Sequence, residues 1–421
     1  MTRDQVDHYR VILALAAAVF CLLLIQLLPM PPALWTSLSG RGIIVDIDKA
    51  ANLASVWRPL SMTPALTWNA LYSLFVPLAV LFLAIQLKRE ERFQLLNVLL
   101  VLGLCSGLLG LLQVSGGADG PLYLYRITNN GSAVGLFSNR NHAAVALACL
   151  FPMLAVFVSV GINSVEQKRV RGWLAVVSGL VLVPLLLVTG SRAGIIVGLA
   201  GLVAVLFLYR RPTMDRPAKR KIQKVNMTYV YGGIAVFAMA ILTSLFARAQ
   251  ALDRLLASNQ PEDLRFQIWG PIAELAWKYF PAGSGFGSFA SVYQIDEQDT
   301  LLSATYVNHA HNDWLEVYLT GGLIGILLLS AVVVAWVLAS FKVWIKTFDG
   351  SREMAFARLA STLLFMLGLA SLGDYPLRVP SIMCIAVLCG VWLRDGIGSG
   401  EVSKILMLEK NGSSKDSPLA A

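Results

Sequence analysis

The sequence predicts an all-α polytopic membrane protein, with about ten transmembrane helices and one large, partly helical loop on the outer side. Hydrophobic residues make up 57% of the 421 residues and charged residues only 14%, whereas soluble domains carry about 25% charged residues. The apolar residues form blocks of roughly 20 that charges do not interrupt, which is the length needed to cross a bilayer. Each block is expected to be a helix, because unpaired backbone groups cannot remain in hydrocarbon.

Ten stretches of the chain are predicted to span the membrane. They cover residues 11–29, 67–87, 94–114, 142–160, 173–189, 193–209, 228–247, 319–341, 356–373 and 378–394. Their side chains are apolar nearly all round, as helices embedded in lipid require. The five cysteines all lie inside these stretches and none forms a C-x-x-C pair, so neither a disulfide nor a thiolate metal site is expected.

The positions of Lys and Arg predict the orientation, because cytoplasmic loops carry an excess of them. The basic loops Lys88–Arg92, Lys168–Arg171 and Arg210–Lys224 alternate with loops that are poorer in Lys and Arg. Both termini are therefore expected in the cytoplasm. Attraction of these loops to anionic lipid headgroups accounts for the net charge of +9, so nucleic acid is not expected as a partner.

Five segments follow from this topology. They are 1–66 (first span and outer loop), 67–247 (spans two to seven), 248–318 (a large periplasmic loop), 319–394 (spans eight to ten) and 395–421 (a cytoplasmic disordered tail). The large loop contains its own helix signal, since Pro261 is followed by Arg265, Ile268, Trp269 and Ile272 at helical spacing.

Four predicted spans begin at the outer face, where a helix N-terminus offers free N–H groups and favours anions. Polar residues gather at these four starts. They are Ser138–His142, Ser191–Arg192, Asn308–Asp313 and Asp374–Arg378. The outer face is therefore predicted to hold the functional site.

Two arginines near these starts each have two interpretations. Arg192 is either an arginine that snorkels to the membrane boundary or a ligand for phosphate, whose oxygens match a guanidinium fork. Arg265 either stacks on Trp269 at the surface of the loop helix or forms the second arm of an anion clamp.

Three of the four histidines, His142, His309 and His311, lie at the outer face, whereas His8 precedes the first span and is expected to be solvated. The pair His309-x-His311 matches no zinc pattern, so no metal and no cofactor is predicted. A general base is the better interpretation for one histidine, because imidazole titrates near neutral pH.

Together these residues resemble the O-antigen ligase family, which also includes O-antigen-type polysaccharide polymerases and protein O-oligosaccharyltransferases. The resemblance covers about residues 140–380. It rests on Gly135–His142, Ser191–Gly194, Arg265 with Trp269, Pro281-x-Gly283-x-Gly285, His309-x-His311-Asn312 and Asp374–Pro376.

The resemblance implies a GT-C-like membrane glycosyltransferase of the bacterial inner membrane that acts at the periplasmic face without a metal. It implies a polyprenyl diphosphate-linked glycan as donor and a glycan, a lipid core or a protein as acceptor. The family's two arginines and histidine match Arg192, Arg265 and His311, with His309 as the rival histidine. Further candidates for substrate contacts are Arg140, His142, Ser191, Trp269, Asn312, Asp374 and Arg378.

The expected reaction is attack of an acceptor hydroxyl on the anomeric carbon, with inversion, while the arginines stabilise the departing diphosphate. A polymerase would use the same site with a different acceptor, so the sequence does not distinguish a ligase from a polymerase. A transporter or lipid-linked glycan flippase is the rival from another class. It would require ionisable residues deep within the spans, and the polar groups gather at one end instead.

Overall fold

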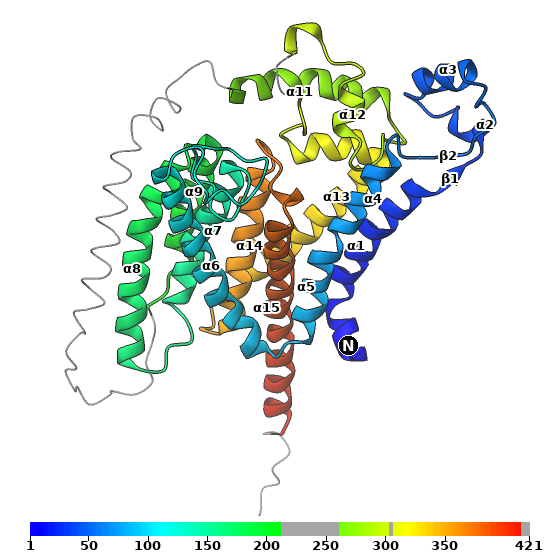
Figure 1. The fold of residues 1–421 in the computed structure, drawn as a ribbon. Coiled ribbons are helices and arrows are strands. Elements are labelled where there is room, and N and C mark those ends of the chain that lie inside the picture. The colour runs from blue at the N-terminus through cyan, green and yellow to red at the C-terminus, as the bar shows by residue number, and fades with distance from the viewer. Residues whose placement is uncertain (212–260, 303–305, 414–421) are drawn as a thin grey trace, which may run out of the picture.

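The computed structural model of the chain describes residues 1–211, 261–302 and 306–413, with side chains from Arg265 in the second range and up to Gly398 in the last. Long helices lie side by side, and a layer of short helices covers one end of this bundle (Figure 1). The prediction of an all-α polytopic membrane protein is confirmed. The predicted seventh span, 228–247, lies outside the described residues.

Among the described residues, eight helices are long and apolar enough to cross a membrane. They are α1 (Arg3–Leu27), α4 continued by α5 (Pro64–Ser73 and Phe75–Gln86), α6 (Arg89–Ser115), α7 (Arg140–Phe157), α8 (Val165–Val188), α13 (Asp313–Ile345), α14 (Arg352–Ala370) and α15 (Pro380–Ser413). The shorter apolar helix α9 (Arg192–Leu208) matches the predicted sixth span. Every predicted span except the seventh therefore corresponds to a described helix.

Helix α7 is the centre of the bundle. Within its most apolar window 83% of the residues are buried, against 17% in α1 and 11% in α13, and α7 packs against α6, α8, α9 and α14. Glycines allow this close packing: a Cβ on Gly194 would lie 2.2 Å from the Ala144 Cβ, and a Cβ on Gly103 would lie 2.7 Å from Leu150. Small residues are what membrane helices use at such contacts.

Short elements cover the end of the bundle that lies away from the N-terminus (Figure 1). They are β1 (Pro29–Met30) paired antiparallel with β2 (Arg58–Pro59), α2 (Pro32–Trp35), α3 (Gly42–Ala50), α11 (Pro261–Lys278), α12 (Phe289–Tyr293) and the 3-10 helix η1 (Asp299–Leu301). A second 3-10 helix, η2 (Pro376–Arg378), joins α14 to α15. The helix predicted to begin at Pro261 is α11.

Helix α13 is divided at Gly322, whose φ of +57° is non-helical. Gly283, with φ +79°, lies directly against this point, where a Cβ would come within 2.7 Å of the Gly322 nitrogen. The Leu323 N–H donates to the Pro281 carbonyl at 2.9 Å. Only glycine adopts such backbone angles at no steric cost. The break therefore fixes the first turns of α13, from Asp313, within the layer of elements that covers this end of the bundle.

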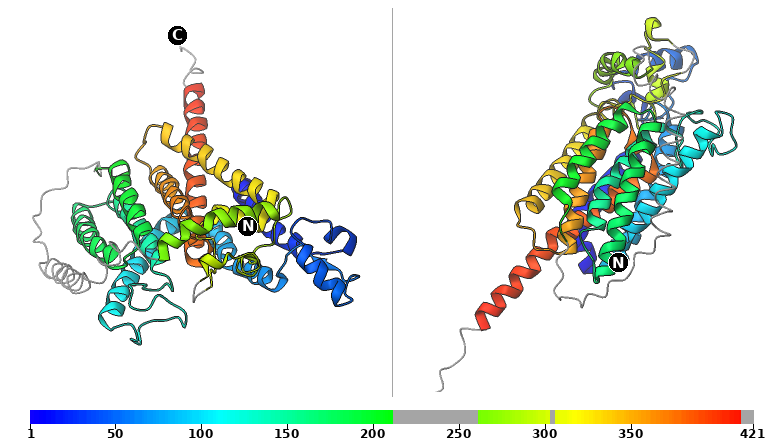
Figure 2. Two further views of the ribbon diagram at one scale, coloured as in Figure 1. Left: turned by 90° about the horizontal axis from the view of Figure 1, so that it is seen from above. Right: turned by 90° about the vertical axis from the view of Figure 1, so that its left-hand side faces the viewer.

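The end of the bundle at which the N-terminus lies differs from expectation in two ways. Helix α15 continues past the predicted end of the tenth span at residue 394 and projects beyond the bundle (Figure 2), so the tail predicted to be disordered is helical as far as Ser413. Within this part, seven of the ten residues 401–410 are Leu, Met, Glu or Lys, which favour helix. His8, expected to be solvated, lies 3.6 Å from the Asp395 carboxylate, which also binds Arg92.

Candidate active site

Four separate segments meet at the end of the bundle that lies away from the N-terminus. The start of α7 supplies His142, the start of α11 supplies Arg265, the segment before α13 supplies His309 and His311, and the turn after α14 supplies Asp374. Each of these elements ends or begins where the long helices meet the outer layer, so side chains that are far apart in the sequence become neighbours.

His311 forms the first of two imidazole–carboxylate pairs. Its Nδ1 lies 3.1 Å from the Asp374 Oδ1, and the Arg265 Nη1 lies 4.0 Å from the other carboxylate oxygen. The Asp374 side chain is 1% exposed and that of His311 is 15% exposed. A buried carboxylate that accepts from Nδ1 orients the ring and leaves Nε2 as the nitrogen that can accept a proton.

His309 forms the second pair. Its Nδ1 lies 3.1 Å from the Glu316 Oε1, and the second oxygen of this carboxylate accepts from the Ala310 N–H at 2.9 Å. Arg378 neutralises Glu316 at 3.2 Å and Asp313 at 3.1 Å. Because Glu316 is fully buried, this arginine is the partner that makes a charged carboxylate tolerable there.

Tyr375 packs against all three outer histidines. Its ring centroid lies 4.2 Å from that of His309, 4.9 Å from that of His142 and 5.1 Å from that of His311. Its hydroxyl accepts a hydrogen bond from the Asn308 amide at 3.3 Å. The aromatic ring therefore fixes the spacing of the three imidazoles.

The backbone of the His309–His311 segment is held in an unusual conformation. His311 has φ +48°, which costs a non-glycine residue of the order of 1 kcal/mol and persists only where the surroundings enforce it. The Trp269 indole donates to the Ala310 carbonyl at 3.2 Å, and the Asn312 side chain caps α13 by accepting from the Leu315 N–H at 3.1 Å. These contacts hold His311 against Asp374.

Burial and nearby charges shift the pKa values of His311 and Asp374. Burial lowers the pKa of His311; the hydrogen bond with Asp374 opposes this shift, and the charge of Arg265 adds to it. Burial alone would raise the pKa of Asp374, but the hydrogen bond with His311 and the charge of Arg265 outweigh burial and hold that pKa well below its usual range. At neutral pH the pair is therefore a neutral imidazole beside an ionised carboxylate.

Arg192 is the first residue of α9, at the same end of the bundle. Its helix packs on α7 through Gly194 and Ala144, and Ala144 is two residues from His142. Arg140, the first residue of α7, reaches toward this junction, since a Cβ on Gly190 would lie 3.7 Å from its Nη1. Arg140 therefore lies close to the Gly190 turn that precedes Arg192, at the junction of α7 and α9.

Some of the predicted substrate-contact residues have structural roles instead. The Ser191 hydroxyl is fully buried and caps α9 by accepting from the Gly194 N–H at 3.0 Å, which does not fit a substrate contact. Asn312 and Trp269 hold the backbone around His311, as described above. Arg378 faces two carboxylates, and those two ion pairs occupy its guanidinium.

Three residues of the cluster were not among the predicted site residues. Glu316 and Asp313 lie in the first turns of α13, and Tyr375 lies next to Asp374. An acidic residue at the edge of an apolar span is often functional. The position of Glu316 could therefore have indicated a role from the sequence alone. In the described part of the chain, no group of three or more His, Cys, Asp or Glu side chains is arranged to hold a metal ion.

Comparison with known proteins matches part of the chain, including several residues of this site, to a family. Residues 175–330 match the family model described as O-antigen ligase, a range that includes Arg192, Arg265, His309 and His311. No curated protein matches the chain. The family implies membrane glycosyltransferase activity of the ligase or polymerase type. The resemblance seen in the sequence motifs is confirmed over residues 175–330, which match the O-antigen ligase family.

Proposed function

We propose that the protein transfers a glycan from a polyprenyl diphosphate carrier, such as undecaprenyl diphosphate, to an acceptor hydroxyl at the periplasmic face of the bacterial inner membrane. The observation that supports this most strongly is the pairing of His311 with Asp374 beside Arg265. It combines a neutral imidazole that can accept a proton with a guanidinium that can bind phosphate.

The donor is held by its diphosphate. Arg265 and Arg192 bind the phosphate oxygens, because a guanidinium presents a fork of N–H donors that fits them. The N-terminus of α9 beside Arg192 adds favourable partial charge. The polyprenyl tail extends into the lipid between the helices, which fits a site at the end of the bundle.

The chemical step is a direct displacement. The acceptor oxygen forms a bond to the anomeric carbon while the bond from that carbon to the diphosphate breaks, so the configuration inverts. The acceptor proton moves to the Nε2 of His311, and the imidazolium that forms is stabilised by Asp374. Arg265 and Arg192 stabilise the charge that grows on the diphosphate. Because two guanidinium groups supply positive charge, the step requires no divalent ion.

His311 is the preferred base over His309. The carboxylate beside His311 lies next to Arg265, so the proton acceptor and the phosphate ligand share one carboxylate. The carboxylate beside His309 is instead neutralised by Arg378, and the His309 ring packs more closely on Tyr375 than that of His311 does. His309 therefore positions Tyr375 and supports the His309–His311 segment.

Replacement of each histidine in a cell that lacks the native gene tests this assignment. His311→Ala is expected to reduce glycan transfer by about 10²-fold or more, the usual contribution of a general base, and His309→Ala is expected to reduce it less. His8→Ala, at the opposite end of the bundle, is the matched control. Full transfer by His311→Ala at normal protein level would remove His311 from the mechanism.

Ligase and polymerase differ only in the acceptor, since both use one carrier-linked donor site. Gel analysis of the glycans in the strain without the gene separates them. Carrier-linked polymer that accumulates without attachment indicates a ligase, and loss of polymer length indicates a polymerase. Loss of glycan from proteins alone would indicate a protein acceptor.

A further inference from the structure

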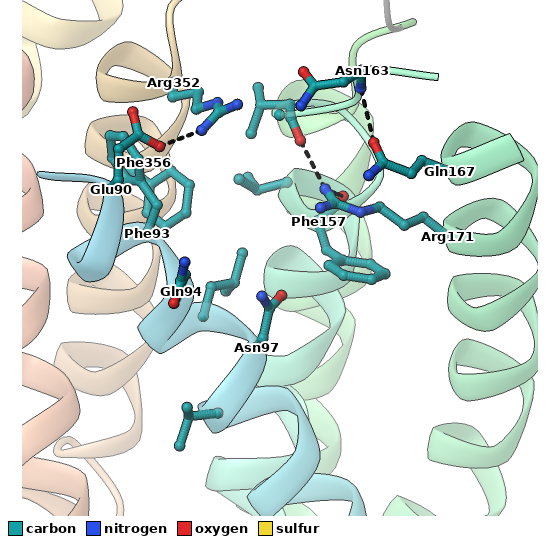
Figure 3. Close-up of a pocket in the computed structure, with 15 residues that line it drawn as sticks. Glu90, Phe93, Gln94, Asn97, Phe157, Asn163, Gln167, Arg171, Arg352 and Phe356 are labelled. Carbon is teal, nitrogen blue, oxygen red and sulfur yellow. Dashed lines mark hydrogen bonds and ion pairs between the residues drawn. The ribbon is translucent and has the colours of Figure 1, made fainter. Parts of the chain in front are cut away.

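A cleft lies at the end of the bundle opposite to the histidine cluster, where the N-terminus is found. Its volume is about 460 Å³, and it is lined by the start of α6, the end of α7, the start of α8 and the start of α14 (Figure 3). The positive-inside pattern puts this end at the cytoplasmic leaflet. The histidine cluster shares no residue with it, so the cleft is separate from the proposed transfer site.

Arg171 provides one positive wall of the cleft. Its Nη1 donates to the carbonyls of Phe157 and Val160 at 3.2 and 3.0 Å, and its guanidinium lies 4.9 Å above the Phe157 ring. Within the described residues no carboxylate pairs with Arg171. A half-buried cation at the membrane boundary without a counter-charge is an expected site for an anion.

Arg352 provides the facing positive wall. Its guanidinium lies against Gly161, where a Cβ would come within 3.1 Å of its Nε. Its acidic partner is Glu90, at 2.6 Å, whose side chain is 71% exposed. An ion pair with so exposed a carboxylate is weak, so Arg352 is available to a second anion. The turn Val160–Gly161 thus has one guanidinium on each side.

Both polar and apolar side chains of α6 line the rest of the cleft. Gln94 and Asn97 present exposed amides on α6 (Figure 3). Leu96 and Val98 of the same helix line the cleft beside them. An amide exposed to hydrocarbon is costly unless it finds a hydrogen-bond partner. The ester carbonyls of a glycerolipid are acceptors that could bind both amides.

We propose that this cleft binds a glycerophospholipid of the inner leaflet. The phosphate lies between Arg171 and Arg352, the glycerol esters meet Gln94 and Asn97, and one acyl chain follows the apolar side of α6. Guanidinium forks match the oxygens of the phosphate, and the apolar part of the cleft distinguishes a lipid from free phosphate.

Native mass spectrometry of the full-length protein in mild detergent, titrated with dioleoylphosphatidylglycerol, tests the proposal. The double variant Arg171→Gln/Arg352→Gln is expected to bind this lipid about tenfold more weakly or worse, as the loss of charge-assisted hydrogen bonds implies. The control Arg3→Gln/Arg10→Gln removes the same charge from exposed positions of α1 and should change the affinity less than about twofold.

A second variant covers the case in which the double variant fails to fold. Asn97→Phe keeps both arginines, replaces an exposed amide by a larger apolar side chain that fills the cleft, and should also weaken lipid binding. Equal binding by Asn97→Phe and the unchanged protein would overturn the proposal. So would an equal loss in the α1 control, which indicates general surface charge, or displacement of the lipid by an equal concentration of inorganic phosphate.

Discussion

His311 and Asp374 show how single residues set the proposed chemistry. The ring reaches the carboxylate only because His311 adopts φ +48° and because the indole of Trp269 holds the neighbouring carbonyl. The sequence marks His311 as a candidate base but contains no sign that Asp374, 63 residues away, is its partner. That pairing depends on the meeting of two turns, which no local pattern encodes.

Opposite shifts in the pH dependence of transfer are predicted for the two partners of His311. Transfer requires neutral His311, so its rate should rise as the pH passes upward through the pKa of that imidazole. Asp374 raises this pKa and Arg265 lowers it. Asp374→Asn should therefore move the midpoint of the increase in transfer rate to lower pH, and Arg265→Ala should move this midpoint to higher pH.

Initial rates of the purified protein at saturating donor, measured across the pH range, give both midpoints. Lys278→Gln, which breaks an exposed ion pair with Asp296 in the same outer layer, serves as the control and should leave the midpoint in place. Midpoints that move in the same direction in both variants would contradict the assigned electrostatics.

At the scale of elements, glycines decide where the helices approach one another. The spacing Gly194/Gly198 indicates a packing face from sequence alone, and the structure puts α7 and the Leu186 side chain of α8 against it. The break at Gly322 is not indicated by spacing, because Gly321 and Gly322 look like any small pair in an apolar run. It arises from contact with Gly283, a residue of a distant loop.

Gly194→Ala is predicted to destabilise the bundle. Its methyl group would lie 2.2 Å from the Ala144 Cβ, which forces α9 away from α7 and should cost about 1–3 kcal/mol. The apparent Tm in detergent should fall. Gly172→Ala, on α8 with nothing within 4 Å, should leave it unchanged or raise it slightly through better helix propensity. An unchanged Tm in Gly194→Ala would contradict this prediction, because it would show that α9 can move away from α7 without loss of stability.

At the scale of the whole molecule, apolar blocks and basic loops were sufficient to predict the spans. They were sufficient because hydrocarbon leaves the backbone few alternatives to helix. They gave no sign of Tyr375 packed between three histidines, since the four residues come from three distant parts of the chain. The length of α15 was also missed, because its C-terminal part carries charges that resemble a solvated tail.

The predicted topology puts the histidine cluster in the periplasm and the lipid cleft at the cytoplasmic leaflet. Cysteine labelling with a membrane-impermeant maleimide tests it. Lys49→Cys, on the exposed face of α3, should react in cells whose outer membrane is permeabilised, and Glu166→Cys, at the start of α8, should react only after the inner membrane is disrupted. The reverse pattern would place the proposed transfer site in the cytoplasm and exclude a periplasmic reaction.

Reconstituted transfer tests the central claim most directly. The full-length protein in liposomes is supplied with a synthetic polyprenyl diphosphate-linked glycan and a hydroxyl acceptor in the presence of EDTA, and both the glycosylated acceptor and the released polyprenyl diphosphate are measured. The account predicts equal amounts of the two products from the unchanged protein and about 10²-fold less of each from His311→Ala. Product that forms only with added divalent metal, or undiminished product from His311→Ala, would contradict it.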